Sequence, residues 1–372
     1  MEYTTIGESC SVVSGGTPSR TKNEYWIDGT IPWIKIGNIK SKYVNEYDEL
    51  ITEKGLNNSS AKLLEKGTIL YTIFATLGEV GILDIEACTN QAIAGITIND
   101  SRITTDYLYY YLKSKKDYVN NIGRGVAQNN INLTTLKKFE IPLIDINKQL
   151  KIVKALEKSE ELIALKKKEI DDLDLLIKAR FVEMFGNPVI NDKEWKQESL
   201  GRLATKIGSG ATPKGGKETY REDGIALIRS MNVHNGQFEY KDLAHISYEQ
   251  ASQLDNVTIE ENDILLNITG ASVARCCIAP ADILPARVNQ HVCIVRCKGS
   301  IMPNFLSFLL IDDNYQDLLW SIAGGGATRE AITKQQIENL QIILPPIELQ
   351  QQFADFAKQV DKSKFIQMNS TI

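Results

Sequence analysis

The most regular pattern of hydrophobic and polar positions lies between residues 147 and 185, a stretch that contains no glycine. Lysines and glutamates surround a seam that advances by alternating steps of four and three residues, which is typical of a coiled-coil helix. The seam positions are Ile152, Leu156, Ser159, Ile163, Lys166, Ile170, Leu173 and Ile177. Gly186 and Pro188 follow this stretch and predict the end of the helix.

A coiled-coil seam requires a partner helix, and the chain contains a candidate near its carboxyl end. The same spacing recurs there, at Leu349, Phe353, Phe356 and Val360. We therefore predict that the two helices pair within the chain and run antiparallel.

The rest of the chain is made of short apolar, β-branched runs that glycine and asparagine turns separate. These runs match one another at an offset of roughly 195 to 201 residues. Matching segments recur in the same order, with 13–18 against 207–213, 28–39 against 223–233, 69–70 against 264–265, 90–93 against 289–292, 123–127 against 324–327, and Gln149 against Gln350. A repeat of this length is a whole domain.

Each copy also contains one predicted amphipathic helix, over residues 104–121 and 302–323. The first carries apolar residues at helical spacing, and we assign them to core packing. They are Tyr107, Leu108, Tyr111, Leu112 and Tyr118.

The predicted fold class is α+β, with two duplicated mixed α/β domains joined by long helices that form an antiparallel coiled coil. The expected organisation is a first domain over 1–146, a spacer helix over 147–185, a second domain over 186–347 and a carboxyl-terminal helix over 348–372. The offset places the end of that last helix roughly 14 residues beyond Ile372, so we expect it to be shorter than the spacer helix.

Composition agrees with a globular protein of two to three domains, because 43% of the 372 residues are hydrophobic and 24% are charged. No run approaches the roughly 18 apolar residues of a membrane span, and the amino terminus lacks a basic flank before an apolar run. We therefore expect a soluble cytoplasmic protein. The six cysteines are irregularly spaced, which favours reduced, buried residues over disulfides or a metal site. Cys293 and Cys297 are expected on the same face of one strand.

The order of these parts resembles the specificity subunit of type I restriction-modification systems over nearly the whole chain. The residues that carry this resemblance are the doubled turns ending in Thr17-Pro18 and Thr212-Pro213, the segment Ile31-Pro-Trp-Ile-Lys-Ile-Gly-Asn38, the doubled Asn90-Gln91 and Asn289-Gln290, and Ile141-Pro-Leu143 leading into Gln149. The resemblance implies that each domain reads one part of a split DNA target and that the spacer sets the gap. It also implies that modification subunits dock on the helices and methylate adenine with S-adenosylmethionine, and that restriction subunits cut DNA with ATP and Mg.

DNA recognition needs polar and basic side chains on loops that can reach base edges or phosphates. The candidates in the first domain are Ser14, Thr17, Arg20, Lys35, Asn38, Arg124, Gln128, Asn129 and Asn130. The candidates in the second domain are Thr212, Lys214, Arg229, Asn232, Arg275 and Arg329. Lys35 and Arg229 follow equivalent apolar segments and have no evident acidic neighbour. For Gln91 and Gln290 a structural hydrogen bond is favoured over a DNA contact.

The net charge of -5 argues mildly against DNA binding, because lysine and arginine supply most of the affinity for phosphates. Basic residues must then be gathered locally. Catalytic motifs are missing: residues 210–217 do not match a phosphate-binding loop, and Leu344-Pro-Pro-Ile347 lacks the polar and aromatic ends of an adenine methyltransferase motif. We therefore predict no catalytic centre, no metal and no cofactor in this chain. The alternatives are a stand-alone DNA-modifying enzyme with fused recognition domains and a duplicated scaffold that does not bind DNA.

Overall fold

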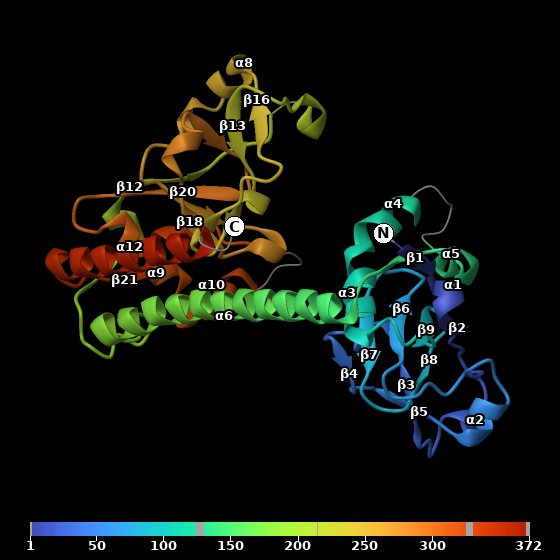
Figure 1. Cartoon of the computed structure of the whole chain (residues 1–372). Helices are drawn as coiled ribbons and strands as arrows, with labels where there is room; N and C mark the ends of the chain where they lie inside the picture. The colour runs from blue at the N-terminus through green and yellow to red at the C-terminus, as the bar shows by residue number, and fades with distance from the viewer. Residues whose placement is uncertain (1, 124–129, 214, 325–329, 370–372) are drawn as a thin grey trace. The chain divides into compact units, whose positions relative to one another are not determined.

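The computed structural model describes residues 2–123, 130–213, 215–324 and 330–369 (Figure 1). The chain divides into two compact units, Met1–Leu162 and Ile163–Ile372. We call them unit 1 and unit 2. Arg124, Gln128, Asn129, Lys214 and Arg329 lie outside the described residues.

Unit 1 is built on a five-stranded sheet in the order β2-β9-β6-β7-β4. Its strands are β2 (Cys10–Ser14), β9 (Ile93–Ile98), β6 (Ile69–Thr72), β7 (Val80–Leu83) and β4 (Tyr43–Val44). A second sheet, in the order β5-β3-β8, contains β5 (Glu49–Ile51), β3 (Ile31–Ile34) and β8 (Cys88–Thr89). The ends of the unit meet where β1 (Glu2–Thr5) pairs antiparallel with β10 (Glu140–Leu143). Every residue of β6 and β7 is buried, so the core lies around these strands.

Unit 2 repeats this arrangement. Its larger sheet has the order β12-β20-β17-β18, from β12 (Ala204–Ser209), β20 (Val292–Cys297), β17 (Ile264–Asn267) and β18 (Cys276–Ile278). Its smaller sheet joins β16 (Ala244–Ile246), β13 (Ile225–Ile228) and β19 (Ala286–Val288). A third pair joins β11 (Gln197–Ser199) and β21 (Gln341–Ile343), and a hairpin joins β14 (Val233–His234) and β15 (Gln237–Phe238).

The strand register shows that the two units are copies of one fold. Ile69 in β6 lies opposite Ile96 and Ile82, and Ile264 in β17 lies opposite Val295 and Ile278. The predicted duplication and the mixed α/β fold class are therefore confirmed.

Short helices fill the connections in both units. In unit 1 they are α1 (Ile6–Ser9), α2 (Glu53–Asn57) and α5 (Leu133–Lys137), with the 3-10 turns η1 (Asn23–Tyr25) and η2 (Ile36–Asn38). In unit 2 they are α7 (Leu200–Leu203), α8 (Tyr248–Ser252) and α11 (Lys334–Glu338), with η3 (Gly216–Thr219), η4 (Ser230–Asn232), η5 (Asp255–Val257), η6 (Gly270–Ser272) and η7 (Ala281–Ile283).

The prediction of one amphipathic helix per copy is wrong, because each is broken into two. Unit 1 has α3 (Thr105–Ser114) and α4 (Lys116–Gly123), and unit 2 has α9 (Pro303–Ile311) and α10 (Asp313–Gly324). In unit 2, Asp312 has a non-helical ψ of 138°, and its carboxylate accepts hydrogen bonds from the backbone of the next helix, at 3.0 Å from Asn314 N. This cap favours a new helix start over continuation.

The apolar face predicted for the first of these helices is mostly correct. Tyr107, Leu108 and Leu112 are buried and Tyr111 is half-buried, whereas Tyr118 is 55% exposed.

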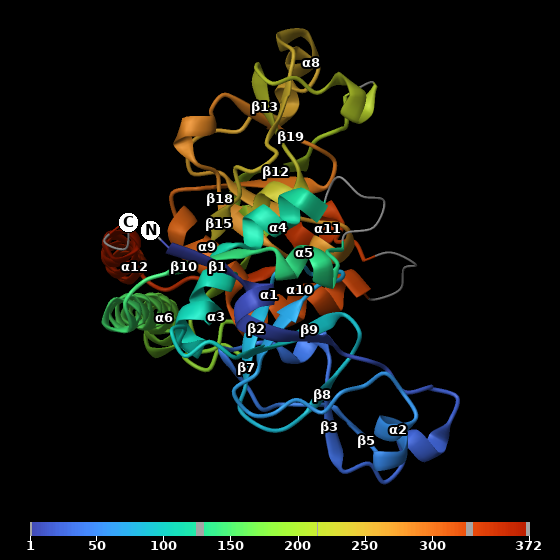
Figure 2. The ribbon, with the colours of Figure 1, turned by 45° about the vertical axis from the view of Figure 1, so that its right-hand side comes forward.

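The predicted spacer helix is confirmed as α6 (Ile146–Phe185). It ends where expected, since Gly186 has a φ of +72° and donates a backbone hydrogen bond to Val182 at 2.8 Å. The predicted partner is α12 (Ile347–Asn369). Figures 1 and 2 show the two helices side by side.

The contacts between α6 and α12 show that the helices run antiparallel. The ring centroids of Phe353 and Phe181 are 5.3 Å apart, and Lys364 Nζ lies 2.6 Å from the Asp174 carboxylate. Later residues of α12 therefore contact earlier residues of α6. Of the predicted seam, Ile177, Phe353 and Val360 are buried, Ile170, Leu173, Leu349 and Phe356 are half-buried, and Ile152, Leu156 and Ile163 are 42%, 39% and 43% exposed. The amino-terminal part of the seam is thus uncovered in the described structure.

The cysteines behave as small apolar residues. All six are free thiols, and five of them are buried. Cys293 and Cys297 both pack on the core of unit 2, as predicted for two residues on one face of β20. Burial raises the pKa of the Cys297 thiol to about 12. Within the described ranges, no helix is long and apolar enough to span a bilayer, and no three His, Cys, Asp or Glu residues form a group that could hold a metal ion.

Candidate nucleic-acid interface

The doubled Thr-Pro turn and the doubled Asn-Gln segment meet in both units. The Thr17 hydroxyl donates a hydrogen bond to Gln91 Oε1, and the Thr212 hydroxyl donates one to Gln290 Oε1. Both glutamines therefore make a structural hydrogen bond of the kind favoured for them. Each pair ties the turn after the first strand of the main sheet to the loop before β9 or β20, so the loops occupy equivalent positions in the two units.

Asn38 and Asn232 are structural residues, and we remove them from the set of contact candidates. They are 5% and 0% exposed. Each accepts a backbone hydrogen bond from the residue three positions earlier, over 2.8 Å from Lys35 N and 3.1 Å from Arg229 N. Their amide groups stabilise the η2 and η4 turns and leave little side-chain surface for a DNA base.

The expectation that Lys35 has no acidic neighbour is wrong. Lys35 Nζ lies 3.1 Å from Glu49 and 3.4 Å from Asp48, and Arg20 lies 2.6 Å from the other Glu49 oxygen. Burial alone would raise the pKa of Glu49, but the hydrogen bonds from Arg20 and Lys35 outweigh it and lower that pKa. The Arg20 guanidinium also lies 3.7 Å from the centre of the Trp26 ring. A DNA phosphate would have to compete with these carboxylates for the two cations.

Arg229 occupies the equivalent position in unit 2 with different partners. Its guanidinium lies 5.3 Å from the centre of the Tyr220 ring and donates to the Asp242 backbone carbonyl. It forms no ion pair with any acidic residue that the structure describes, and its buried Nε has no hydrogen-bond partner there. The nearest acidic residue that it contacts is Asp242, and that contact is through the backbone carbonyl.

The remaining described candidates lie on loops beside these turns. Ser14 is half-buried at the end of β2, and its hydroxyl donates to the Gly15 carbonyl at 3.2 Å. Asn130 forms an isolated bridge with Phe74, on the loop after β6. Arg275 lies on the equivalent loop of unit 2, after β17. Whether any candidate touches DNA stays a prediction.

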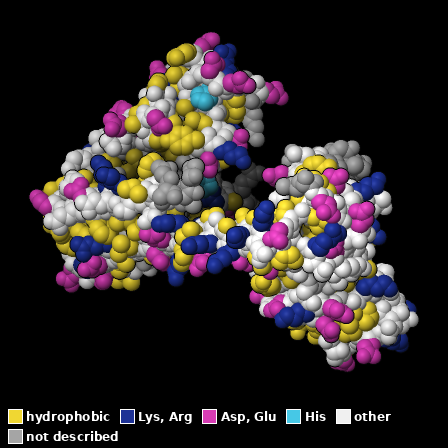
Figure 3. Space-filling view, in the orientation of Figure 1, with side chains coloured by type: hydrophobic (Ala, Val, Ile, Leu, Met, Phe, Trp, Pro, Cys, Tyr) yellow, Lys and Arg dark blue, Asp and Glu magenta, His cyan; other side chains and the backbone are white. Residues whose placement is uncertain are grey.

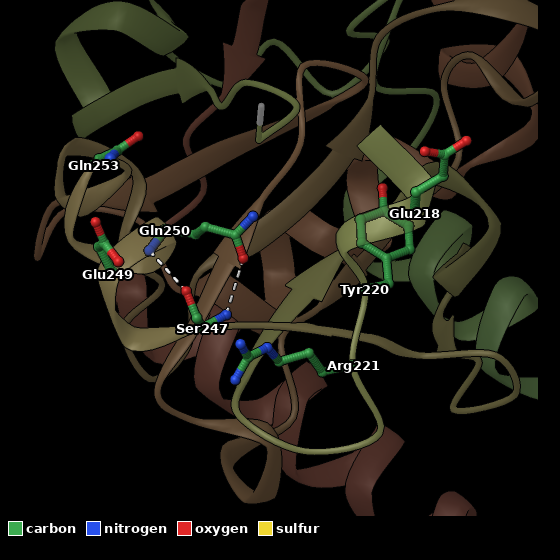
Figure 4. Close-up of a pocket in the computed structure, with 7 residues that line it drawn as sticks. All are labelled: Glu218, Tyr220, Arg221, Ser247, Glu249, Gln250 and Gln253. Carbon is green, nitrogen blue, oxygen red and sulfur yellow. Dashed lines mark hydrogen bonds between the residues drawn. The ribbon is translucent and has the colours of Figure 1, made fainter. Parts of the chain in front are cut away.

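On the face that Figure 3 shows, the described basic residues are not gathered into one large patch. On the face seen in Figure 3, lysine and arginine side chains are interspersed with aspartate and glutamate over both units. A hollow of about 510 Å³ lies between η3 and α8 in unit 2 (Figure 4). Its wall carries Glu218 and Glu249 beside Arg221, and its Ser247 and Gln250 side chains are engaged in capping α8. This mixed charge does not favour a nucleic-acid site.

Reasoning from the sequence missed the contacts that three residues make beside the candidate site and at the long helices. His291 lies beside Gln290 on the loop before β20, where unit 1 has Ala92, and the aligned Asn-Gln pairs already contained this difference. Gln149 and Gln350 were matched without a role, yet both are fully buried. Gln149 Oε1 accepts from Thr104 N at 3.0 Å and Gln350 Oε1 accepts from Met302 N at 2.9 Å, so each anchors its long helix to the start of the helix pair in its unit.

These features define a class of protein with two equivalent mixed α/β units, each carrying variable loops on a common frame and each followed by a long helix. Comparison with known proteins agrees. The family model described as type I restriction modification DNA specificity domain matches residues 1–175 and 192–372. The chain therefore belongs to this family.

Individual relatives and structures are similar over much of the chain. The type I restriction enzyme MjaIX specificity subunit of Methanocaldococcus jannaschii is 29% identical over 94% of this chain and 83% of its own length. The EcoR124I/EcoR124II specificity subunit of Escherichia coli is 29% identical over 44% of this chain and 41% of its own length. The S subunit structure from M. genitalium has a TM-score of 0.55 at 14% identity, covering 100% of this chain and 91% of that chain. A structure from a study of type I system assembly has a TM-score of 0.64 at 19% identity, covering 100% and 93%.

Proposed function

We propose that this chain reads a two-part DNA target, with one part recognised by each unit and with the gap set by α6. As a specificity subunit, the chain selects the sequence, and subunits bound to it carry out the chemistry. We assign this function to the cytoplasm, where the DNA is found.

The observation that carries the proposal is that the two units share the same strands and structural hydrogen bonds, which we call the frame, while the side chains on their loops differ. The frame is the same in both units, down to the Thr-Gln hydrogen bonds and the buried Asn38 and Asn232 caps. The side chains on the equivalent loops differ, as at Lys35 and Arg229. A constant frame with different loop chemistry is what two readers of different base sequences require.

The long helices supply surfaces for protein partners. Leu162, Leu165, Leu175 and Leu176 on α6 are 51%, 56%, 61% and 47% exposed. Apolar side chains that recur along one exposed helix are typical of protein interfaces. We assign this surface to the modification subunits and place the restriction subunits in the same assembly.

The chain itself is proposed to have no catalytic activity. S-adenosylmethionine is assigned to the modification subunits, and ATP and Mg to the restriction subunits. The purified chain incubated with DNA and these cofactors should then neither methylate nor cut it, while the chain together with modification subunits should methylate a two-part site. Turnover by the chain alone would support the stand-alone enzyme, and failure of every assembled complex to bind DNA would support the scaffold.

A further inference from the structure

A second hollow in unit 2 lies among the loops that differ between the units. It has a volume of about 470 Å³ and is formed by η4, by η6 with Thr269 before it and Arg275 after it, and by the loop before β20. The residues used below are Ser230, Met231, Thr269, Ser272, Arg275 and His291. We call it the Arg275 pocket.

The Arg275 guanidinium is available to a ligand. It is half-buried and forms no hydrogen bond or ion pair with any residue in the described part of the chain. Among the residues that the structure describes, no acidic side chain lines the pocket. The other arginine and lysine candidates that the structure describes, Arg20, Lys35 and Arg229, are all engaged by carboxylates, rings or carbonyls.

The walls of the pocket are held in place by buried groups. Asn267 is fully buried, and its amide donates to the Ser230 carbonyl at 2.8 Å. Gly270 begins the opposite wall with a φ of +71°, a conformation that favours glycine. The pocket is therefore formed before any ligand arrives.

A chain of hydrogen bonds runs from Gln290 through two residues that line the pocket, His291 and Thr269. Gln290 Nε2 donates to His291 Nε2 at 3.1 Å, because an amide nitrogen is only a donor. The imidazole proton then resides on Nδ1 and is donated to the Thr269 hydroxyl at 2.6 Å. Since Thr269 Oγ1 already accepts this bond, its own proton remains for an acceptor on a ligand.

The same place in unit 1 has different chemistry. Thr72 N donates a hydrogen bond to the Glu79 carbonyl, and at the equivalent place in unit 2 Asn267 N donates one to the Arg275 carbonyl. Glu79 is therefore the counterpart of Arg275. Glu79 is neutralised by Lys116 at 2.6 Å.

The other positions of the pocket differ as well. Ile73 N donates a hydrogen bond to the Ala92 carbonyl, and Ile268 N donates one to the His291 carbonyl. Unit 1 therefore has an alanine where unit 2 has the histidine. Phe74 forms an isolated β-bridge with Asn130, and Thr269 forms one with Ala331, so Phe74 is the counterpart of Thr269. The frame is shared, and the side chains facing this position are not.

We infer that the Arg275 pocket binds the major-groove edge of a guanine in the half of the DNA target that unit 2 reads. The inference rests on the proposed function. Arginine reads guanine because its paired N–H donors match O6 and N7. The Thr269 hydroxyl adds a donor, and Met231, which is 44% exposed, adds an apolar wall that a phosphate would not need.

The test measures affinity of the complex with modification subunits for a panel of duplexes, each with one base pair of the two-part site changed. Arg275→Ala should reduce the preference for guanine at one position of one half-site by about ten-fold or more. Arg275→Lys should restore part of the affinity without the preference, because a point charge cannot bond both acceptors. Thr269→Phe, which copies unit 1, should have the same effect as the alanine variant.

Arg221→Ala is the matched control, because Arg221 lies in the mixed-charge hollow of the same unit (Figure 4). Thermal melting establishes that each variant is folded. An equal loss for every duplex, with a salt slope reduced by about 1, would overturn the inference and make Arg275 a phosphate contact. Unchanged binding by Arg275→Ala would also overturn it. Failure of the unmodified complex to bind any duplex would instead refute the proposed function.

Discussion

Shortening α6 by one heptad should shorten the gap between the two parts of the DNA target. The structure indicates which seven residues to delete. Glu157 and Glu160 lie 2.6 Å from Lys42 and Lys113 of unit 1, so both should remain. Deleting residues 161–167 keeps these bonds. It removes the contacts of Lys166 with Glu169 and Gln367 and two leucines of the proposed docking surface, Leu162 and Leu165.

The expected displacement follows from helix geometry. Seven residues at about 1.5 Å each shorten the helix by about 10 Å, and the seam is kept in phase to within about 20°. At about 3.4 Å per base pair, the gap should lose about three base pairs.

Selection from a duplex library with randomised sequence and spacing would measure the change, after gel filtration confirms that the complex has assembled. Both half-sites should persist. Duplicating residues 161–167 is the matched control and should lengthen the gap by the same amount. An unchanged gap at unchanged affinity would refute the claim that α6 measures distance.

Three further perturbations test the packing. Phe353→Ala removes a fully buried ring that contacts three others and should lower the free energy of unfolding by about 3–5 kcal/mol in urea titrations. Gln149→Ala leaves the buried backbone groups that it satisfies without partners and should cost about 1–3 kcal/mol or more in the same titration, whereas an exposed Gln351→Ala control should cost little. The pKa of Glu160 is lowered, because hydrogen bonds from Lys113 and Tyr110 outweigh the effect of burial, so its contribution to stability is present above its unfolded pKa and lost as the pH falls through the folded pKa. Glu160→Gln should therefore lower the melting temperature near pH 7 and have less effect below about pH 4, and an equal effect at both would contradict this.

The long-range plan of the fold could be predicted because it depends on patterns that repeat. The seam of α6, its stop at Gly186 and the doubled turns are local signals whose physics does not depend on the rest of the chain. The break before α10 was missed, because capping by Asp312 competes with an otherwise continuous apolar pattern.

The candidate site was predicted less well, because exposure and pairing are set by tertiary contacts. The sequence suggested that Asn38 is exposed, but the η2 turn buries its side chain. Lys35 lacked an acidic neighbour along the chain, but the pairing of β3 with β5 places Trp33 opposite Glu49 and brings that carboxylate within reach. His291 was overlooked because its hydrogen bond with Thr269, which lies on another loop, is set by the tertiary structure.

The most direct test of the central claim is to exchange the first reading unit and determine the methylated sequence. Residues 1–145 would be replaced by the first domain of a relative with a different target, and the chimera would be expressed with its modification subunits. Methylome sequencing should then show a site in which one half has changed while the other half is retained. A change in both halves, or in neither, would contradict the assignment of one half-site to each unit.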